Sequence, residues 1–497
     1  MKQVLRKGIR DIVVDEVPDP VVSPHHVLVH PVYSLISSGT ETASIHQQGV
    51  LKEVADNPSQ LQKIWRVMQV TGPLSTVAEV KAKFSEYAVL GYSGAGIVAE
   101  KHPTVTDLEI GDRVAYGGEG TGHGESVVTG RNLVARVPKE VPFEHACFAT
   151  LGSIAMNAVR IASIGLGEVV AVIGQGLVGQ LISQLVRLQG GVVVAIDLKS
   201  GRTDLACRLG ADYGLTGGTG LREAVGSLTS GRGADCVIVA AAAKSPAPCQ
   251  QALEICRDRG RIVVVGAVGM EFPWQEMYLK EIQLLMSRAY GPGSYDPVYE
   301  KQGQDYPLPY VRWTENRNME EFLRLAAQKR VQIEPLVTHR FPLDKAPEAY
   351  QTILDPASGS LAVLLEYPTA AEPGRERRPQ RKVGISTAPA GGDIRAALVG
   401  AGNLARWTHL PNLKKIPGVN LQAVCSTSGA RGKSYGLRFR AAYCCSEYKT
   451  VLEDAAINLV LITSRNQEHA AQALAALGAG KHVFLEKPMA LTEAECA

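Results

Sequence analysis

The stretch VVAVIGQGLVG, Val169–Gly179, decides the fold of the first part of this chain. Its five leading apolar residues are typical of a buried strand, and the apolar residues that follow it are typical of a helix. Between them, Gly174 permits a tight turn, Gly176 lets a pyrophosphate approach the backbone, and Gly179 lets the helix pack closely on the strand. Because helix N–H groups attract phosphates, the stretch predicts a dinucleotide site; the alternative is a glycine loop that serves packing alone.

A carboxylate stands where such a site binds ribose. The next apolar run, 192–196, ends on Asp197, which can accept hydrogen bonds from ribose hydroxyls. The same charge repels a 2′-phosphate, so the sequence favours NAD over NADP at this first site. Arg202, shortly after, can stack on adenine or reach a phosphate, which would weaken that preference.

The surrounding pattern indicates an α/β fold. Residues 168–293 alternate strand and helix, and their strands are continuous β-branched runs, as a parallel sheet with helices on both faces requires. Residues 1–155 show short strands broken by Gly and Pro, such as 27–32 and 95–99, with a helical pattern over 51–86.

A second glycine-rich turn follows a predicted linker. Residues 368–392 are rich in Pro, Gly, Ala and Arg, and a new strand–turn–helix pattern begins after them. Its turn contains Gly400, Gly402 and, in the third place, Ala405, whose side chain is small enough for close helix packing. The two glycine-rich units differ outside the turn, so we interpret them as two unrelated domains.

The sequence around the second turn does not decide between NAD and NADP. The second strand of this unit ends with the residues Ala423–Thr427, with no carboxylate where Asp197 stands in the first unit. Arg431 and Lys433 are near and would attract a 2′-phosphate. We therefore expect NAD or NADP at the second site, with NADP favoured.

Length and composition exclude several classes of protein. A length of 497 residues predicts about three domains, and 52 Lys plus Arg against 49 Asp plus Glu leave no net field for nucleic acid. Nine Cys without a CxxC pair predict reduced thiols and no metal framework. The N-terminus lacks a signal peptide and no apolar stretch is long enough for a membrane span, so we expect a cytoplasmic protein.

The order of units and several motifs resemble a known family. The motifs are SSGTE (Ser37–Glu41), GYSGAGIV (Gly91–Val98) and GDRV (Gly111–Val114), beside the first glycine-rich turn. Residues 1–367 are similar to the medium-chain, zinc-type alcohol dehydrogenases. The resemblance implies a GroES-like catalytic domain over 1–155, a Rossmann domain over 156–295, and a return segment over 296–367 that completes the first domain.

The zinc ligands of that family are missing here. At the positions of its catalytic metal ligands and their neighbours, this chain has Ser38, Tyr92, Ser93 and Ala149, and the four-Cys structural zinc lobe is absent. Catalytic zinc needs three protein ligands of N, S or carboxylate type. We therefore expect no metal.

Another donor must then stabilise the substrate oxygen during hydride transfer. Tyr92 and Thr40 stand at or beside the vacated ligand positions, and the resemblance places His123 on a loop near the same cleft. Each has a structural alternative: a buried Tyr bonded to backbone, a turn Thr, a surface His. The polar-aromatic segments 290–296 and 312–318 suit a polyhydroxyl ligand, or else form a hydrogen-bonded structural loop.

The last part of the chain resembles a second family. GAGKHVFLEKP (Gly478–Pro488), with Asn466 and His469 upstream, is similar to the N-terminal Rossmann domain of the Gfo/Idh/MocA oxidoreductases over residues 393–497. The resemblance implies cofactor contacts from Asn466, Glu486, Lys487 and Pro488. It also implies proton transfer by Lys487, for which a buried lysine with a lowered pKa is suited.

The substrate domain of that second family does not follow within these 497 residues, so we expect the second unit to bind nucleotide without turning over substrate alone. The resemblance to proteins that fuse both units implies an NAD(P)-dependent oxidoreductase acting on a sugar, polyol or sugar nucleotide, near cell-surface polysaccharide metabolism. Two alternatives stay open: a quinone or enone reductase, and a catalytically silent dinucleotide sensor. We expect a homo-oligomer with a carbohydrate-like small-molecule substrate and no nucleic-acid or membrane partner.

Overall fold

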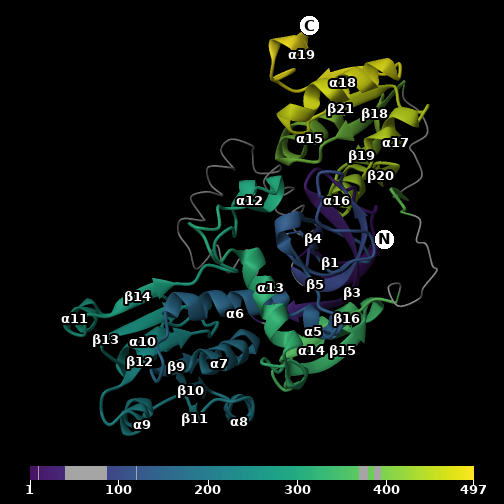
Figure 1. Cartoon of the computed structure of the whole chain (residues 1–497). Coiled ribbons are helices and arrows are strands. Elements are labelled where there is room, and N and C mark those ends of the chain that lie inside the picture. Colours follow the sequence, from purple (N-terminus) through teal and green to yellow (C-terminus); the bar gives the residue numbers. More distant parts are fainter. Residues whose placement is uncertain (9–10, 38, 40–86, 119, 369–378, 386–392) are drawn as a thin grey trace.

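The structure is a computed structural model of the chain. It describes every residue except 9–10, 38, 40–86, 119, 369–378 and 386–392. Figure 1 shows a parallel sheet with helices at the lower left, a mainly antiparallel β unit to its right, and a second parallel sheet at the top right. The predicted α/β class with two Rossmann-type sheets is therefore confirmed. The helical pattern over 51–86 lies outside the described residues.

The antiparallel unit contains two sheets. The larger has the strand order β15-β16-β3-β5-β6-β8, with β7 beside β3, and the smaller has the order β2-β1-β4. Every pair is antiparallel except β15 with β16. The first eight strands are β1 (Lys2–Lys7), β2 (Asp11–Glu16), β3 (His26–Ser37), β4 (Tyr87–Val89), β5 (Ser93–Lys101), β6 (Arg113–Gly117), β7 (Val127–Gly130) and β8 (Val134–Arg136). The short helix η1 (Arg131–Leu133) precedes β8, and α5 (Phe143–Ala146) and α6 (Ala149–Ala162) lead into the next unit.

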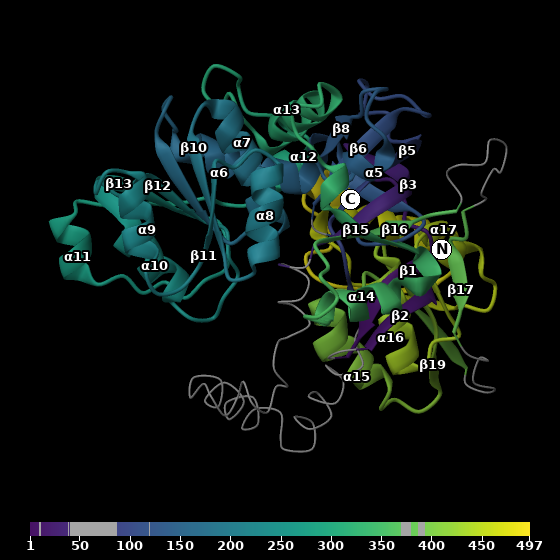
Figure 2. The same cartoon turned by 90° about the horizontal axis from the view of Figure 1, so that it is seen from below.

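The first Rossmann sheet has six parallel strands in the order β11-β10-β9-β12-β13-β14. Its central strands are buried on both faces, because helices cover each side (Figure 2). The strands are β9 (Val169–Ile173), β10 (Val192–Asp197), β11 (Tyr213–Thr216), β12 (Ala234–Val239), β13 (Cys256–Val264) and β14 (Gln283–Met286). The helices are α7 (Leu177–Gln189), α8 (Ser200–Arg208), α9 (Leu221–Leu228), α10 (Ala247–Ile255) and α11 (Trp274–Leu279).

After β14 the chain returns to the antiparallel unit. Helix α13 packs on α6, and β16 pairs with β3, so the return segment completes the sheet in which the chain began. The elements of this segment are α12 (Pro297–Gln302), α13 (Glu315–Ala327), η2 (Glu334–Leu336), β15 (Val337–Pro342), η3 (Leu343–Lys345), α14 (Ala346–Leu354) and β16 (Ala362–Glu366).

The C-terminal sheet has the order β17-β20-β19-β18-β21-β22 and is parallel except for β17. Strand β17 comes from the segment that the sequence indicates as linker, so part of that segment belongs to the second Rossmann sheet. The strands are β17 (Lys382–Gly384), β18 (Ile394–Val399), β19 (Val419–Cys425), β20 (Tyr443–Cys445), β21 (Leu459–Ile462) and β22 (His482–Leu485). The helices are η4 (Ala405–His409), α15 (Leu410–Leu413), α16 (Gly429–Phe439), α17 (Tyr448–Glu453), η5 (Asn466–Glu468), α18 (His469–Gly478) and α19 (Glu493–Cys496).

Helix α16 fixes this C-terminal unit to the small sheet at the start of the chain. Lys433 Nζ lies 2.7 Å from Asp15 Oδ1 and donates to the Glu16 carbonyl at 2.6 Å. Beside it, Ala430 packs into an apolar cluster with Met1 and Val17. Because the Lys433 side chain is only 11% exposed, this ion pair is largely shielded from water.

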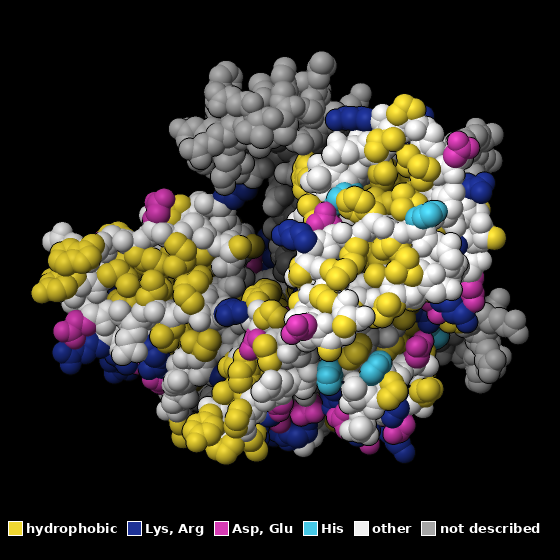
Figure 3. Space-filling model, turned by 90° about the horizontal axis from the view of Figure 1, so that it is seen from above, with side chains coloured by type: hydrophobic (Ala, Val, Ile, Leu, Met, Phe, Trp, Pro, Cys, Tyr) yellow, Lys and Arg dark blue, Asp and Glu magenta, His cyan; other side chains and the backbone are white. Residues whose placement is uncertain are grey.

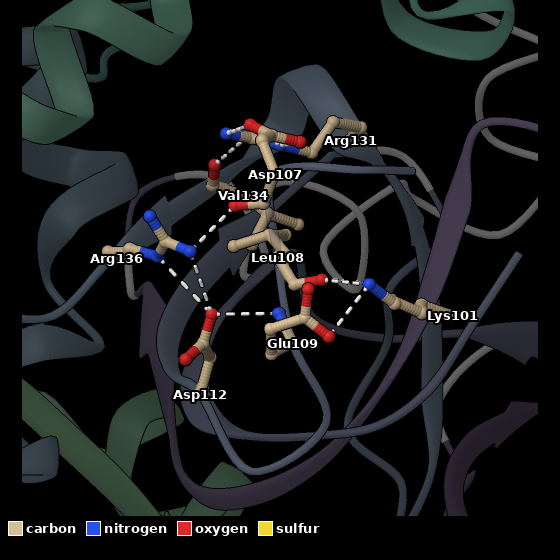
Figure 4. Close-up of polar contacts among 8 residues, drawn as sticks. All are labelled: Lys101, Asp107, Leu108, Glu109, Asp112, Arg131, Val134 and Arg136. Carbon is tan, nitrogen blue, oxygen red and sulfur yellow. Dashed lines mark hydrogen bonds and ion pairs between the residues drawn. The ribbon is translucent and has the colours of Figure 1, made fainter. Parts of the chain in front are cut away.

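A charged network holds the segment between β5 and β6 against β8 (Figure 4). Arg136 reaches Asp112 and donates to the Asp107 carbonyl, and Arg131 is paired with the Asp107 carboxylate. Lys101 closes the turn by donating to the Leu108 carbonyl at 2.6 Å. These groups are partly exposed, so each pair contributes at most about 1 kcal/mol.

Among the described residues no helix is both long enough and apolar enough to cross a membrane.

Candidate functional site

The first glycine-rich turn has a separate physical reason for each glycine. Gly174 has φ +93°, and a Cβ there would lie 2.7 Å from Ala241 backbone atoms. Gly179 lies so close to the turn that a Cβ would be 1.8 Å from the Gly174 carbonyl oxygen. Gly176, the N-cap of α7, has φ −69° and nothing within 4 Å of its Cβ position. The open space over Gly176, at a helix N-terminus, is where a phosphate can meet backbone N–H groups.

Asp197 ends β10 beside this turn. Its Oδ2 accepts from the Gln175 N–H at 2.7 Å and its Oδ1 from the Lys199 N–H at 2.9 Å. Arg202 lies 3.9 Å away and the Asp197 side chain is 10% exposed. The carboxylate is therefore fixed by backbone donors next to the glycine-rich turn, as a ribose ligand needs to be. Arg202 faces this carboxylate, so the positive charge of Arg202 is partly neutralised.

The described residues that the family resemblance assigns to the metal-ligand positions are poor metal ligands. Tyr92 is half-buried and packs against the main apolar core. Ser93 is buried and its hydroxyl donates to the Cys147 carbonyl at 2.6 Å, and Ala149 is buried at the start of α6. Ser38 lies outside the described residues. None of the three described side chains, Tyr92, Ser93 and Ala149, offers a nitrogen, thiolate or carboxylate ligand of the kind that catalytic zinc needs.

The described residues contain one other group that could hold a cation, Glu144, His145 and Glu334. Arg340 donates to Glu144 at 3.1 Å and to Glu334 at 2.9 Å, and His145 is 2.9 Å from Glu334. The Arg340 guanidinium already forms an ion pair with each of the two carboxylates. The group is therefore an ion-pair network between α5, η2 and β15 rather than a metal centre.

The other predicted donors lie in different surroundings. Thr40 is outside the described residues. His123 is 1% exposed, with Nδ1 2.7 Å from the Ser34 hydroxyl, which in turn is 2.8 Å from the Tyr367 hydroxyl. A Cβ on Gly91 would lie 2.6 Å from its ring. His123 is therefore packed in the core behind the loop that carries Tyr92, and the surface position that was the alternative for it is wrong.

The loop after β14 brings further phenols and a carboxyl group to this side of α6. Tyr290 is largely buried, which raises its pKa well above the ordinary value, with Tyr92 and Glu315 adding to the effect. The Tyr290 carbonyl accepts from Ser153 on α6 and from Asn318 on α13. The two loops that carry Tyr92 and Tyr290 are thus close enough for the phenols to interact electrostatically.

Glu315 lies in the segment 312–318 that the sequence suggests for a polyhydroxyl ligand, but the sequence does not indicate that it is a buried acid. It is fully buried, its Oε2 accepts from Ser294 at 3.1 Å, and its Oε1 has no hydrogen-bond partner within the described residues. Burial raises its pKa to about 8, with the nearby Glu300 adding to the shift. Glu315 follows Thr314, the N-cap of α13, where an acid is typical for dipole reasons alone; no sequence signal reveals its burial.

The second glycine-rich turn repeats the geometry of the first. Gly400 has φ +92° and a Cβ there would lie 2.5 Å from the Ser464 amide nitrogen. Gly402 has nothing within 4 Å of its Cβ position, and Ala405 is fully buried. The Thr463 hydroxyl holds the turn by donating to the Gly400 carbonyl at 2.7 Å. This turn too leaves space for a phosphate at its second glycine.

The Glu-Lys-Pro segment lies next to that turn. Glu486 Oε1 is 2.7 Å from His409 Nε2 in η4, and both side chains are mostly buried. His469, also buried, lies 2.8 Å from the Pro488 carbonyl through Nδ1. Lys487 is exposed, as are Asn466 and Pro488. The expected burial of Lys487 is therefore wrong, because this segment runs along the surface of the unit.

Cofactor choice at the second site also needs a correction. Lys433, which was expected to attract a 2′-phosphate, is largely buried and bound to Asp15 of the first β unit. Arg431 remains, exposed on the first turn of α16. One of the two charges that favoured NADP therefore serves domain docking instead.

Family models match two separate parts of the chain. Residues 178–301 match the zinc-binding dehydrogenase model. Residues 394–497 match the Gfo/Idh/MocA model, an oxidoreductase family with an NAD-binding Rossmann fold. The first match lies within the nucleotide-binding sheet and the loop after it, so it does not extend to the positions of the zinc ligands.

Individual relatives of the chain include several dehydrogenases. Sorbitol dehydrogenase from Halalkalibacterium halodurans is 25% identical over 298 residues, which cover 53% of this chain and 79% of the relative. Inositol 2-dehydrogenase from Salmonella typhimurium is 35% identical over 108 residues, 21% of this chain and 31% of the relative. Among solved structures, alcohol dehydrogenase TADH from Thermus sp. ATN1 superimposes with a TM-score of 0.56 at 21% identity, over 74% of this chain and 100% of that one. The chain therefore contains a stretch similar to zinc-binding dehydrogenases, followed by a stretch similar to the Rossmann domain of the Gfo/Idh/MocA oxidoreductases.

Proposed function

We propose that the chain is an NAD-dependent dehydrogenase that interconverts the alcohol and carbonyl forms of a polyol, sugar or sugar nucleotide without a catalytic metal. The observation that carries the proposal is the open space over Gly176 at the N-terminus of α7, with the fixed carboxylate of Asp197 beside it. Gly174, Gly176 and Gly179 would receive the pyrophosphate and Asp197 the adenosine ribose. Arg202 would face the adenine side.

The domain boundaries are part of this proposal. A GroES-like unit over 1–155 and its return over 296–367 would hold the substrate, and a Rossmann unit over 156–295 would hold the cofactor. The strand pairing of β16 with β3 supports this assignment. A second Rossmann unit would follow over 393–497, after a linker of which β17 is an ordered part.

Tyr92 is our first choice for the group that bonds the substrate oxygen. Bound nicotinamide supplies the acceptor or donor of the hydride, and the protein must stabilise charge on the oxygen. A phenol donates a hydrogen bond at neutral pH, and Tyr92 stands where a metal ligand stands in zinc-containing relatives. Thr40 is a second candidate, and His123 a third that would act through its buried network with Ser34.

The substrate class rests on chemistry near this position. Tyr290, Arg288 and Tyr295 follow β14, and the Arg288 guanidinium lies 5.1 Å from the Tyr295 ring centroid. Planar rings and fixed polar groups suit a polyhydroxyl ligand. Two of the relatives are named for the polyols sorbitol and inositol. The role near cell-surface polysaccharides that the fused-protein resemblance implies would use such substrates.

The second unit would bind NAD or NADP at Gly400, Gly402 and Ala405. Glu486, held by His409, would lie beside the bound cofactor. The remaining candidates, Asn466, Lys487 and Pro488, are exposed and would contact the cofactor or transfer a proton from the surface of the unit.

We also propose that a second copy of the chain covers the free edge of the first Rossmann sheet. Figure 3 shows hydrophobic side chains gathered at the end of the molecule where α11 and β14 lie. Trp274 is 74% exposed, Leu279 68% and Met286 59%, and β14 pairs only with β13 in the described part of the chain. An apolar edge strand of this kind is suited to pairing with its own copy. Light scattering should report a dimer that Met286→Lys dissociates, whereas Leu166→Lys, at an exposed apolar position elsewhere, should leave it intact.

Turnover on a substrate panel tests the main proposal. The full chain would be assayed with NAD or NADP against sorbitol, inositol, a sugar nucleotide and a quinone. Oxidation of a polyol or sugar with NAD supports the dehydrogenase. Reduction of the quinone alone would identify a quinone reductase, and cofactor binding without any turnover would identify a sensor.

A further inference from the structure

A cavity of about 520 Å³ lies between the C-terminal ends of α6 and α7 and the helix α13. This volume is within the range of about 300–1,000 Å³ that is usual for sites of small organic ligands. Its apolar wall is formed by Met156, Val159, Leu185, Leu188 and Leu325. Nothing in the chemistry assigned above uses this cavity.

The polar part of the wall carries an excess of positive charge. Arg160, Arg324 and Arg330 line the cavity, with Glu321 as the one carboxylate among its lining residues. Arg324 binds Glu321 through two hydrogen bonds of 2.6 and 2.8 Å, so these two charges cancel. The charges of Arg160 and Arg330 remain, because neither forms an ion pair with any carboxylate in the described ranges.

Arg160 is held in a fixed orientation at the cavity. Its guanidinium carbon lies 3.4 Å from the centroid of the Trp313 ring, and its Nε donates to Asn318 Oδ1 at 2.9 Å. These contacts occupy one face and one N–H of the guanidinium, and leave its terminal amino groups for another acceptor. Burial lowers the pKa of Arg160 to about 10, and the attraction of the nearby Glu321 carboxylate offsets only part of this effect.

The cavity is remote from the dinucleotide turn. Leu188 and Gly176 lie at opposite ends of α7, about 18 Å apart along the helix axis at 1.5 Å per residue. A ligand in the cavity would therefore bind together with the cofactor rather than compete with it.

We propose that this cavity is a second small-molecule site for an organic anion with an apolar body. The anionic group, a carboxylate, phosphate or sulfonate, binds Arg160 and Arg330, and the apolar body lies against the wall that Leu185, Leu188 and Leu325 provide. The excess positive charge of the cavity and its apolar wall match the anionic group and the apolar body of one amphipathic ligand.

The fluorescent anion anilinonaphthalene sulfonate is the probe, with NAD at saturation so that the dinucleotide sites are filled. We expect the probe to bind the full chain under these conditions. Arg330→Gln and Arg160→Gln should each weaken it about fivefold or more, since each removes a charge-assisted contact. Glu321→Gln should strengthen it about threefold, because it releases Arg324 for the anion. Arg312→Gln is the matched control: Arg312 stacks on Trp313 at 3.8 Å but does not line the cavity, so affinity should stay within about twofold.

The uncharged analogue N-phenylnaphthylamine separates charge recognition from apolar adsorption. Its affinity should not change in Arg330→Gln, an exposed position whose variant should fold normally. Three results would overturn the proposal. They are loss of all sulfonate binding when NAD is added, equal changes of affinity in Arg312→Gln and Arg330→Gln, and an unchanged affinity in both Arg330→Gln and Glu321→Gln. An unchanged affinity in both variants would mean that the probe binds another apolar surface, such as the one at α11 and β14.

Discussion

Replacing Gly176 by alanine should separate cofactor binding from folding. Gly176 has φ −69° and ψ −173°, a conformation that any residue adopts, and an added Cβ meets no atom within 4 Å. Alanine therefore introduces no clash in the free protein. If the space over Gly176 receives the pyrophosphate, however, the new methyl group stands where a phosphate oxygen has to meet a backbone N–H.

The two magnitudes can be worked from this geometry. Alanine reduces the freedom of the unfolded chain, which stabilises by about 0.4–1 kcal/mol, and it caps a helix slightly less well than glycine, which offsets most of that gain. The free energy of unfolding should thus change by less than about 1 kcal/mol. Loss of one charge-assisted hydrogen bond to phosphate costs about 1.5–3 kcal/mol, so NAD affinity should fall by about 10- to 100-fold.

Gly179→Ala is the matched control. Its Cβ would lie 1.8 Å from the Gly174 carbonyl oxygen, so helix and turn must move apart and stability must fall along with affinity. Titration calorimetry with NAD and thermal unfolding without it measure both quantities for the two variants. The reasoning is refuted if Gly176→Ala binds NAD as tightly as the original chain, or if it is destabilised as much as Gly179→Ala.

Three further predictions concern single side chains. Asp197→Asn should weaken NAD binding by about 1–3 kcal/mol. It should also improve binding of NADP, because Arg202, 3.9 Å away, loses its counter-charge. Unchanged affinities in calorimetry would show that Asp197 is not the ribose ligand. Tyr92→Phe should lower turnover by about 10²–10³ while leaving NAD affinity and the melting temperature nearly intact, and a variant that keeps more than about half of its rate would pass the role to Thr40 or His123. Glu315 keeps its proton in the folded chain up to a pKa of about 8 but loses it near 4.5 in the unfolded chain, so folding binds a proton between these pH values. The free energy of unfolding should therefore fall by up to about 1.4 kcal/mol per pH unit between pH 4.5 and 8. Denaturant titrations of Glu315→Gln should lack this dependence on pH, and a dependence equal to that of the original chain would refute the assignment.

The glycine-rich turns and the sheets around them were predictable because they depend on local sequence. A strand, a turn with glycines at set spacing and a helix form one continuous stretch, and the structure shows that stretch twice, around Gly176 and around Gly402. Strand ends were predictable for the same reason. The sequence places Asp197 at the end of the second strand, and the structure shows it beside the first turn.

What depended on contacts between distant segments was not predictable. Lys433 is near the second nucleotide turn in sequence, but the docking of α16 on the first sheet pairs it with Asp15, more than four hundred residues earlier. His123 is read from sequence as a loop residue, yet Ser34 and Tyr367 enclose it from two other parts of the chain. The burial of Glu315 likewise results from the return of the chain onto α6, which no local pattern contains.

Turnover by metal-depleted protein tests the central claim most directly. The full chain would be dialysed against a chelator, its zinc content measured, and the same sample assayed for reduction of NAD by sorbitol, inositol and a sugar nucleotide. The account predicts NAD-dependent oxidation of at least one of these at a rate that added zinc does not change, in protein with far less than one zinc per chain. Activity that is lost with the metal and returns with stoichiometric zinc would contradict it.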